Sequence, residues 1–156
     1  MAPLLETRPA GPAADQTRSL QDTVVELIDL SLQAKQAHWN VVGPMFRPLH
    51  ELLDEFTAQY RDWYDTVAER LTAIGFAPDG RSATVSASTP FAQLPEGQLT
   101  DIAVLGLFDE RVTMIASRVH DRLAILGDDD LVSQDVLIEI LRGLEKQRWM
   151  LRAHRA

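Results

Sequence analysis

Apolar residues recur every three or four positions along four long stretches of this chain, which is the spacing of one face of an α-helix. In the first stretch they are Leu20, Val24, Leu27, Ile28 and Leu32. In the second they are Leu49, Leu53, Phe56, Tyr60, Trp63, Val67 and Leu71. These patterns predict helices over 17–39 and 47–75, a third from about 100 to 126 and a fourth from about 131 to 154. Gly75 and Gly127 follow the second and third stretches and are typical helix ends.

A long connection separates the second and third helices. Residues 76–97 are rich in Gly, Pro, Ser and Thr, and Thr89-Pro90 predicts a short helix over 91–94. No strand-pairing signal is visible. We therefore expect an all-α fold, a four-helix bundle with a short helix in the middle connection. Residues 1–17 contain three prolines and no apolar run, which predicts a flexible N-terminal tail before a bundle domain over 18–156.

Composition narrows the classes of function. The chain has 156 residues, 46% of them hydrophobic, which fits one domain with a real core. Its net charge of −8 argues against a general phosphate-binding surface. The acidic balance suits cations better, and ordinary solubility explains it equally well. Without cysteine it has no disulfide, thiolate metal site or thiol nucleophile. We see neither a secretory signal in 1–17 nor a membrane-spanning segment, so we expect a cytoplasmic protein.

Four potential metal ligands lie on one face of the second predicted helix. They are His50, Asp54, Asp65 and Glu69. At about 100° per residue, this face points away from the apolar stripe of the same helix. Asp54 and Asp65 are 11 residues apart, or about 16 Å along a straight helix. Because metal–ligand bonds are only about 2 Å long, one chain cannot bring all four to one metal.

The numbering of these residues is symmetric. His50 and Glu69 add to 119, and so do Asp54 and Asp65. If a second copy of the helix crosses antiparallel about a two-fold axis between 59 and 60, His50 meets Glu69 of the partner subunit. By the same rule Asp54 meets the partner's Asp65. A two-fold interface repeats every contact, so the dimer would hold two equivalent sites, with Ala58 and Arg61 flanking the axis.

His38, near the end of the first helix, is a fifth candidate, because the short turn at 41–44 returns the chain beside His50. Mixed imidazole and carboxylate ligands suit iron, manganese or zinc better than magnesium or calcium. A single helical His is more often structural, and a single Asp is more often only solvated. Five suitable residues in symmetric spacing favour a metal site. Trp39 beside His38 is a packing residue or a quencher of oxidising radicals.

Four sequence motifs resemble those of the Dps (DNA-protection-during-starvation) proteins, or miniferritins. They are KQAHWNV at 35–41, LHELLDE at 49–55, DTVAER at 65–70 and EKQRWMLRAH at 145–154. The resemblance implies a ferritin-like bundle assembled as a hollow dodecamer. It also implies ferroxidase activity, which oxidises Fe(II), usually with hydrogen peroxide, at dimer-interface sites and stores ferric mineral, protecting DNA from oxidative stress. The implied catalytic and metal-binding residues are His38, His50, Asp54, Asp65 and Glu69. No Glu-x-x-His motif of an intrabundle di-iron site occurs.

The resemblance does not decide which residues line a pore or whether the protein binds DNA, and two alternative functions remain open. Asp130 and Asp135 resemble acidic pore residues, and helix capping with solvated charge explains them equally well. Family DNA binding often uses a Lys-rich tail, but here no Lys precedes Lys35, so we expect weak binding. The C-terminal cluster of Lys146, Arg148, Arg152 and Arg155 is the alternative DNA contact or a set of helix-dipole partners. The alternative functions are a nucleoid-binding structural protein with incidental metal binding, and a metal-dependent hydrolase.

Overall fold

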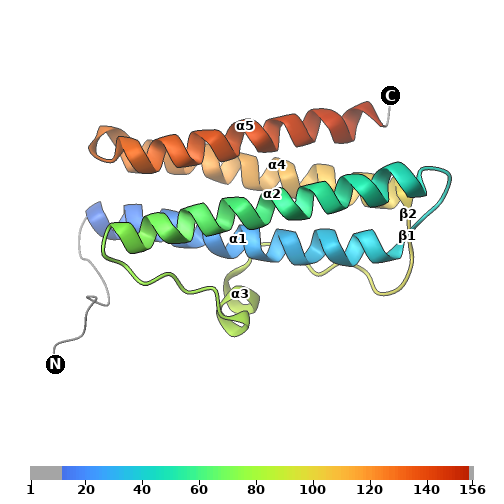
Figure 1. Ribbon diagram of the computed structural model, residues 1–156, viewed down its shortest axis with the longest axis horizontal. Helices are drawn as coiled ribbons and strands as arrows, with labels where there is room; N and C mark the ends of the chain where they lie inside the picture. The colour runs from blue at the N-terminus through green and yellow to red at the C-terminus, as the bar shows by residue number, and fades with distance from the viewer. Residues whose placement is uncertain (1–11, 155–156) are drawn as a thin grey trace.

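Four long helices, each antiparallel to the two helices that it packs against, form a bundle (Figure 1). The computed structural model describes residues 12–154. The long helices are α1 (Pro12–Asn40), α2 (Phe46–Ala73), α4 (Asp101–Leu126) and α5 (Leu131–Ala153). Helix α1 packs against α2 and α4, and α5 also packs against α2 and α4. These four contacts close the bundle. The predicted all-α fold, a four-helix bundle, is confirmed.

The helix ends follow local capping chemistry. Helix α4 begins after Thr100, whose hydroxyl accepts a hydrogen bond from the Ala103 N–H, and it ends at Gly127 with φ +56°, as predicted. Helix α1 begins at Pro12, five residues before the predicted start, because proline is well suited to a first helical turn. Residues 12–17 therefore belong to α1. The tail predicted over 1–17 otherwise lies outside the described residues.

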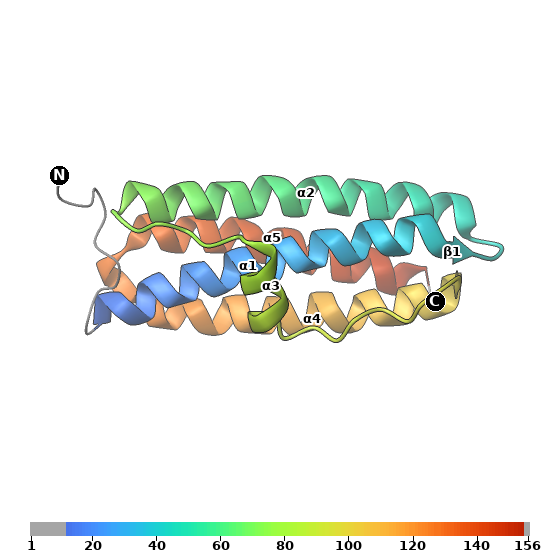
Figure 2. The same cartoon turned by 90° about the horizontal axis from the view of Figure 1, so that it is seen from below.

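The connection between α2 and α4 contains the short helix α3, Ser82–Ser88, which lies against α1 (Figure 2). A short helix in this connection was predicted, but its predicted position at 91–94 is wrong. Proline restricts the residue before it to extended backbone, and Thr89 has φ −63° and ψ 137°. Thr89-Pro90 consequently ends a helix instead of starting one. Phe91 is buried in the core.

Two short strands, β1 (Val41–Val42) and β2 (Leu99–Thr100), pair in parallel, with Val41 opposite Leu99. This pairing was not predicted from the sequence. It ties the turn between α1 and α2 to the start of α4. Gly43 at this turn has φ +130°, and a Cβ there would lie 2.6 Å from the Asp101 carboxylate. That carboxylate accepts a hydrogen bond from the Met45 N–H at 2.8 Å, so glycine is required for the close approach.

Most residues of the predicted apolar stripes lie in the core, but the assignment of Leu32 is wrong, because it is 58% exposed. On α2, Leu49, Leu53, Phe56, Tyr60 and Leu71 are all almost fully buried. The face of α2 that these buried residues leave exposed is the one that carries the predicted ligands. Among residues 12–154, no helix combines the length and the apolar character needed to cross a membrane.

Candidate metal centre

The predicted ligands lie at the end of α1 and on the face of α2 opposite its buried stripe. Asp54, Asp65 and Glu69 are exposed, and His50 is half-buried. His38, in the last turn of α1, is only 8% exposed. The α2 ligands thus point away from the core of their own bundle, as the helical spacing predicted.

His38 and His50 are stacked, with ring centroids 3.6 Å apart and ring planes 18° apart. Nδ1 of His38 lies 2.7 Å from the carbonyl oxygen of His50, and Nδ1 of His50 lies 2.8 Å from the carbonyl oxygen of His38. A carbonyl oxygen only accepts, so each Nδ1 carries a hydrogen and donates it. In the neutral rings, Nε2 then keeps its lone pair. Metal-binding histidines are commonly oriented in this way, with the other nitrogen donating to a carbonyl.

The turn between the two helices brings these histidines together. The β1–β2 pair and the hydrogen bond from Met45 to Asp101 fix the turn. The ring of Phe46 then packs near that of His50, with centroids 5.1 Å apart. Two residues 12 apart in sequence are therefore adjacent because the turn between α1 and α2 places them so.

Asp54 lies beside the histidine pair and forms an ion pair with Lys35 of α1. The hydrogen bond from Lys35 lowers the pKa of the Asp54 carboxyl below its usual value. That hydrogen bond outweighs the opposite effect of desolvation, and the charge of Lys35 acts in the same direction as the bond. Asp54 is thus held as a carboxylate, and in this chain a lysine ammonium group occupies one of its oxygens.

Asp65 and Glu69 lie further along the same face of α2. Neither makes a hydrogen bond or ion pair to another side chain within residues 12–154. In that part of the chain no three His, Asp or Glu side chains are arranged to hold a metal ion. The single chain therefore brings only His38 and His50 into contact. Asp54 lies four residues after His50 on α2, and Asp65 and Glu69 lie further along the same helix.

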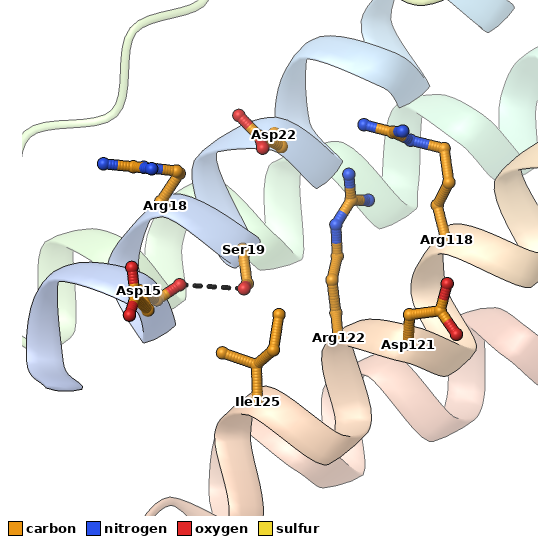
Figure 3. A pocket seen from close by; sticks show the side chains of 8 residues that line it. All are labelled: Asp15, Arg18, Ser19, Asp22, Arg118, Asp121, Arg122 and Ile125. Carbon is orange, nitrogen blue, oxygen red and sulfur yellow. Dashed lines mark hydrogen bonds between the residues drawn. The ribbon is translucent and has the colours of Figure 1, made fainter.

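A cavity of about 350 Å³ lies elsewhere, between the first half of α1 and the second half of α4 (Figure 3). It contains none of the predicted ligands. Its charged lining residues are Asp15, Arg18, Asp22, Arg118, Asp121 and Arg122. The three arginines and three aspartates balance in formal charge, so the cavity favours neither anions nor cations.

A buried ion-pair network forms the wall of this cavity. Glu26 is almost fully buried and accepts two hydrogen bonds from Arg122, at 2.6 and 2.7 Å, and one from Arg118 at 2.6 Å. Burial raises the pKa of the neighbouring Asp22 carboxyl, whereas the charge of Arg122 opposes this rise. The network joins α1 to α4, and we assign it a structural role.

Comparisons with known proteins agree with the motifs. The ferritin-like domain family model matches residues 17–156. The chain is 36% identical over 150 residues to DNA protection during starvation protein 2 of Deinococcus radiodurans, covering 94% of this chain and 62% of that protein. It is 34% identical to the DNA protection during starvation protein of Mycolicibacterium smegmatis, covering 91% and 78%. This chain belongs to the Dps family.

A solved structure shows the same fold. The Dps of Microbacterium arborescens, determined in a high iron form, is 36% identical and superposes with a TM-score of 0.87. The match covers 95% of this chain and 97% of that one. The ferritin-like bundle of this Dps protein is thus the fold that its motifs implied.

The two predicted pore residues have different surroundings. Asp130 caps α5 by accepting a hydrogen bond from the Ser133 N–H at 3.0 Å, and it pairs with Arg70 at 2.8 Å. Desolvation acts to raise the pKa of Asp130, but the bonds from Ser133 and Arg70 outweigh it and lower the pKa. Asp135 is exposed on α5. Capping accounts for Asp130 fully, and the pore role of both residues stays a prediction.

One residue of the C-terminal basic cluster forms an ion pair within this Dps chain. Arg152 pairs with Asp109 of α4 at 3.0 Å, and Arg155 lies outside the described residues. Pairing with Asp109 reduces the positive charge that Arg152 offers to a phosphate. Lys146 and Arg148 make no ion pair within residues 12–154, so a DNA contact by the cluster stays a prediction.

Lys35 is the residue at the centre that sequence reasoning missed. It lies three positions before His38, so both are on one face of α1, and that spacing was the available signal. Its contact with Asp54 depends on how α1 packs against α2. The reciprocal histidine bonds depend on the same packing, which helical periodicity alone does not specify.

Proposed function

We propose that this Dps protein oxidises Fe(II) to Fe(III) at sites shared by two copies of the chain and stores the ferric product. The observation that carries the proposal is the histidine pair, which presents two Nε2 lone pairs beside the Asp54 carboxylate. In the proposed dimer, these three side chains would be one chain's contribution to the ligands of a first-row metal ion.

The partner subunit supplies the remaining ligands in this proposal. Asp65 and Glu69 are exposed and lie on the same face of α2 as His50. An antiparallel crossing about a two-fold axis would bring the partner's Asp65 to Asp54 and the partner's Glu69 to His50. Each site would then have two imidazoles and three carboxylates, and each dimer would have two sites.

Iron is the substrate that best fits both the ligands and the relatives. Imidazole with carboxylate suits Fe(II), and the Microbacterium relative is described in a high iron form. Each Fe(II) gives up one electron, and hydrogen peroxide accepts two. One peroxide with two protons therefore balances two Fe(II) ions and yields two water molecules. Consuming peroxide in this way avoids free hydroxyl radicals and would protect DNA, which the names of the relatives describe.

Storage requires a closed assembly, and this chain has apolar surface to build one. One end of the bundle exposes Ile125, Leu131 and Val132, and the other exposes Trp39, Phe46, Ile102 and Trp149. Exposed apolar clusters mark protein–protein contacts. With the two-fold face of α2, these ends support a homo-oligomer, which we propose to be a hollow cytoplasmic dodecamer.

Iron-oxidation stoichiometry tests the proposed function. Anaerobic protein loaded with Fe(II) should consume one peroxide for two Fe(II), and Zn²⁺ should inhibit by occupying the same ligands without turnover. His38→Ala combined with His50→Ala should abolish the activity, whereas His120→Ala, at an exposed histidine of α4, should not. Equal loss in both variants would contradict this site. Turnover of ester substrates with zinc bound would favour the hydrolase instead.

A further inference from the structure

The outer face of α2 is strongly acidic and has few cations. Its exposed acids are Glu51, Asp54, Glu55, Asp62, Asp65 and Glu69. Its exposed cations are Arg47 and Arg61. Arg47 is already paired with Glu51 at 3.0 Å within its own chain. Placing two such faces together therefore brings like charges together unless some cation remains available.

Arg61 is that cation. Its side chain is exposed and makes no hydrogen bond or ion pair with other residues in 12–154, although Asp65 is one helical turn away. At about 100° per residue it falls within the stripe that runs from His50 to Glu69. It therefore lies among the predicted ligands, and its charge is not paired with an acidic side chain within residues 12–154.

The two-fold arrangement gives Arg61 a specific neighbourhood. Ala58 is its opposite number across the axis, and a methyl side chain leaves room for a guanidinium group. One turn further on, its own Asp65 would face the partner's Asp54. An arginine side chain spans roughly one helical turn, so it reaches this carboxylate pair.

Resting on the shared site of the proposed function, we propose that Arg61 is a positioning residue that donates to the carboxylates shared across the dimer axis and offsets their charge before iron arrives. In the metal-free site, Lys35 offsets Asp54. Asp65 is paired with no cation within residues 12–154, so in the dimer Arg61 supplies that charge. Outer-shell donors of this kind orient ligand carboxylates.

The charge of Arg61 should have two opposite effects. It stabilises the metal-free interface, because it lies between carboxylates that would otherwise repel. It also disfavours a dication at the same carboxylates, because the two are like charges a few ångströms apart. A residue that only packs against the interface would not change assembly and metal affinity in opposite directions.

Three variants of the full chain test this inference. Arg61→Gln keeps a hydrogen-bond donor and removes the charge, Arg61→Lys keeps the charge, and Arg47→Gln makes the same change at an arginine paired within its chain. The melting temperature in chelator at low salt reports the metal-free assembly, and zinc titration calorimetry reports the affinity. Arg61→Gln should melt lower, bind zinc roughly 3- to 10-fold more tightly, and lose both differences at high salt.

Arg61→Lys and Arg47→Gln should resemble wild type in both measurements. The inference is overturned if Arg61→Gln matches Arg47→Gln, or if it binds zinc more weakly than wild type. Failure of the proposed function has a different signature. In that case zinc binding by wild-type protein would survive His38→Ala with His50→Ala, whatever Arg61 does.

Discussion

Individual residues at the centre are oriented mostly by the backbone. Each histidine donates its Nδ1 hydrogen to the carbonyl oxygen of the other, so each ring fixes the other's position. The ion pair between Lys35 and Asp54 adds a side-chain contact between α1 and α2. The residue types of this cluster were predictable from the sequence, but their mutual bonds follow from the packing of α1 on α2.

The reciprocal histidine bonds predict coupling between the two residues. His38→Ala should loosen the His50 ring as well as remove one ligand, and His50→Ala should do the converse. Each single variant should therefore lower zinc affinity by at least about 10-fold, and the double variant should lose less than the sum of the two free-energy changes. Calorimetry on the three variants measures this. Strictly additive losses would show that the rings act independently.

The helices themselves were largely predictable, and the errors have local causes. Gly127 ends α4 as predicted, and the apolar stripe of α2 is buried. The short helix of the connection was misplaced because Pro90 follows Thr89, and α3 ends there. The β1–β2 pair was missed because two-residue strands carry no periodicity. Its partners are far apart in the sequence, so only the tertiary fold brings them together.

The packing of α2 against α5 predicts a difference between two helical glycines. A Cβ at Gly143 would lie 2.3 Å from the indole ring of Trp63 on α2, whereas one at Gly106 would meet nothing within 4 Å. Gly143→Ala should therefore destabilise the fold by about 1–3 kcal/mol. Gly106→Ala should be neutral or stabilise it by up to about 1 kcal/mol. Urea denaturation in chelator compares them, and equal stabilities would contradict the packing of Trp63.

For the whole molecule, charge decides which partners are favoured. The chain carries a net charge of −8, and the C-terminal Arg152 is paired with Asp109. Exposed apolar residues at both ends of the bundle favour copies of the chain itself as partners. The shared role of Asp65 and Glu69 stays a prediction, because their proposed neighbours belong to a second copy of the chain.

The same charge balance predicts weak DNA binding. The assembled protein should shift duplex DNA in a gel only at low salt, because its net charge of −8 per chain repels the phosphates. Arg152→Gln should change this little, since Arg152 is already paired. Tight binding at physiological salt without added divalent cations would show that the C-terminal cluster does contact DNA.

The central claim, that two copies share each metal site, is tested most directly by mixing two inactive variants. His50→Ala and Asp65→Ala should each oxidise Fe(II) poorly when assembled alone. After joint disassembly and reassembly, a mixed dimer keeps one intact site, because one chain supplies the histidines and Asp54 and the other supplies Asp65 and Glu69. Random pairing places half of the dimers in this class, so about a quarter of the wild-type sites should recover. The absence of any recovered peroxide consumption in verified mixed assemblies would contradict the shared site.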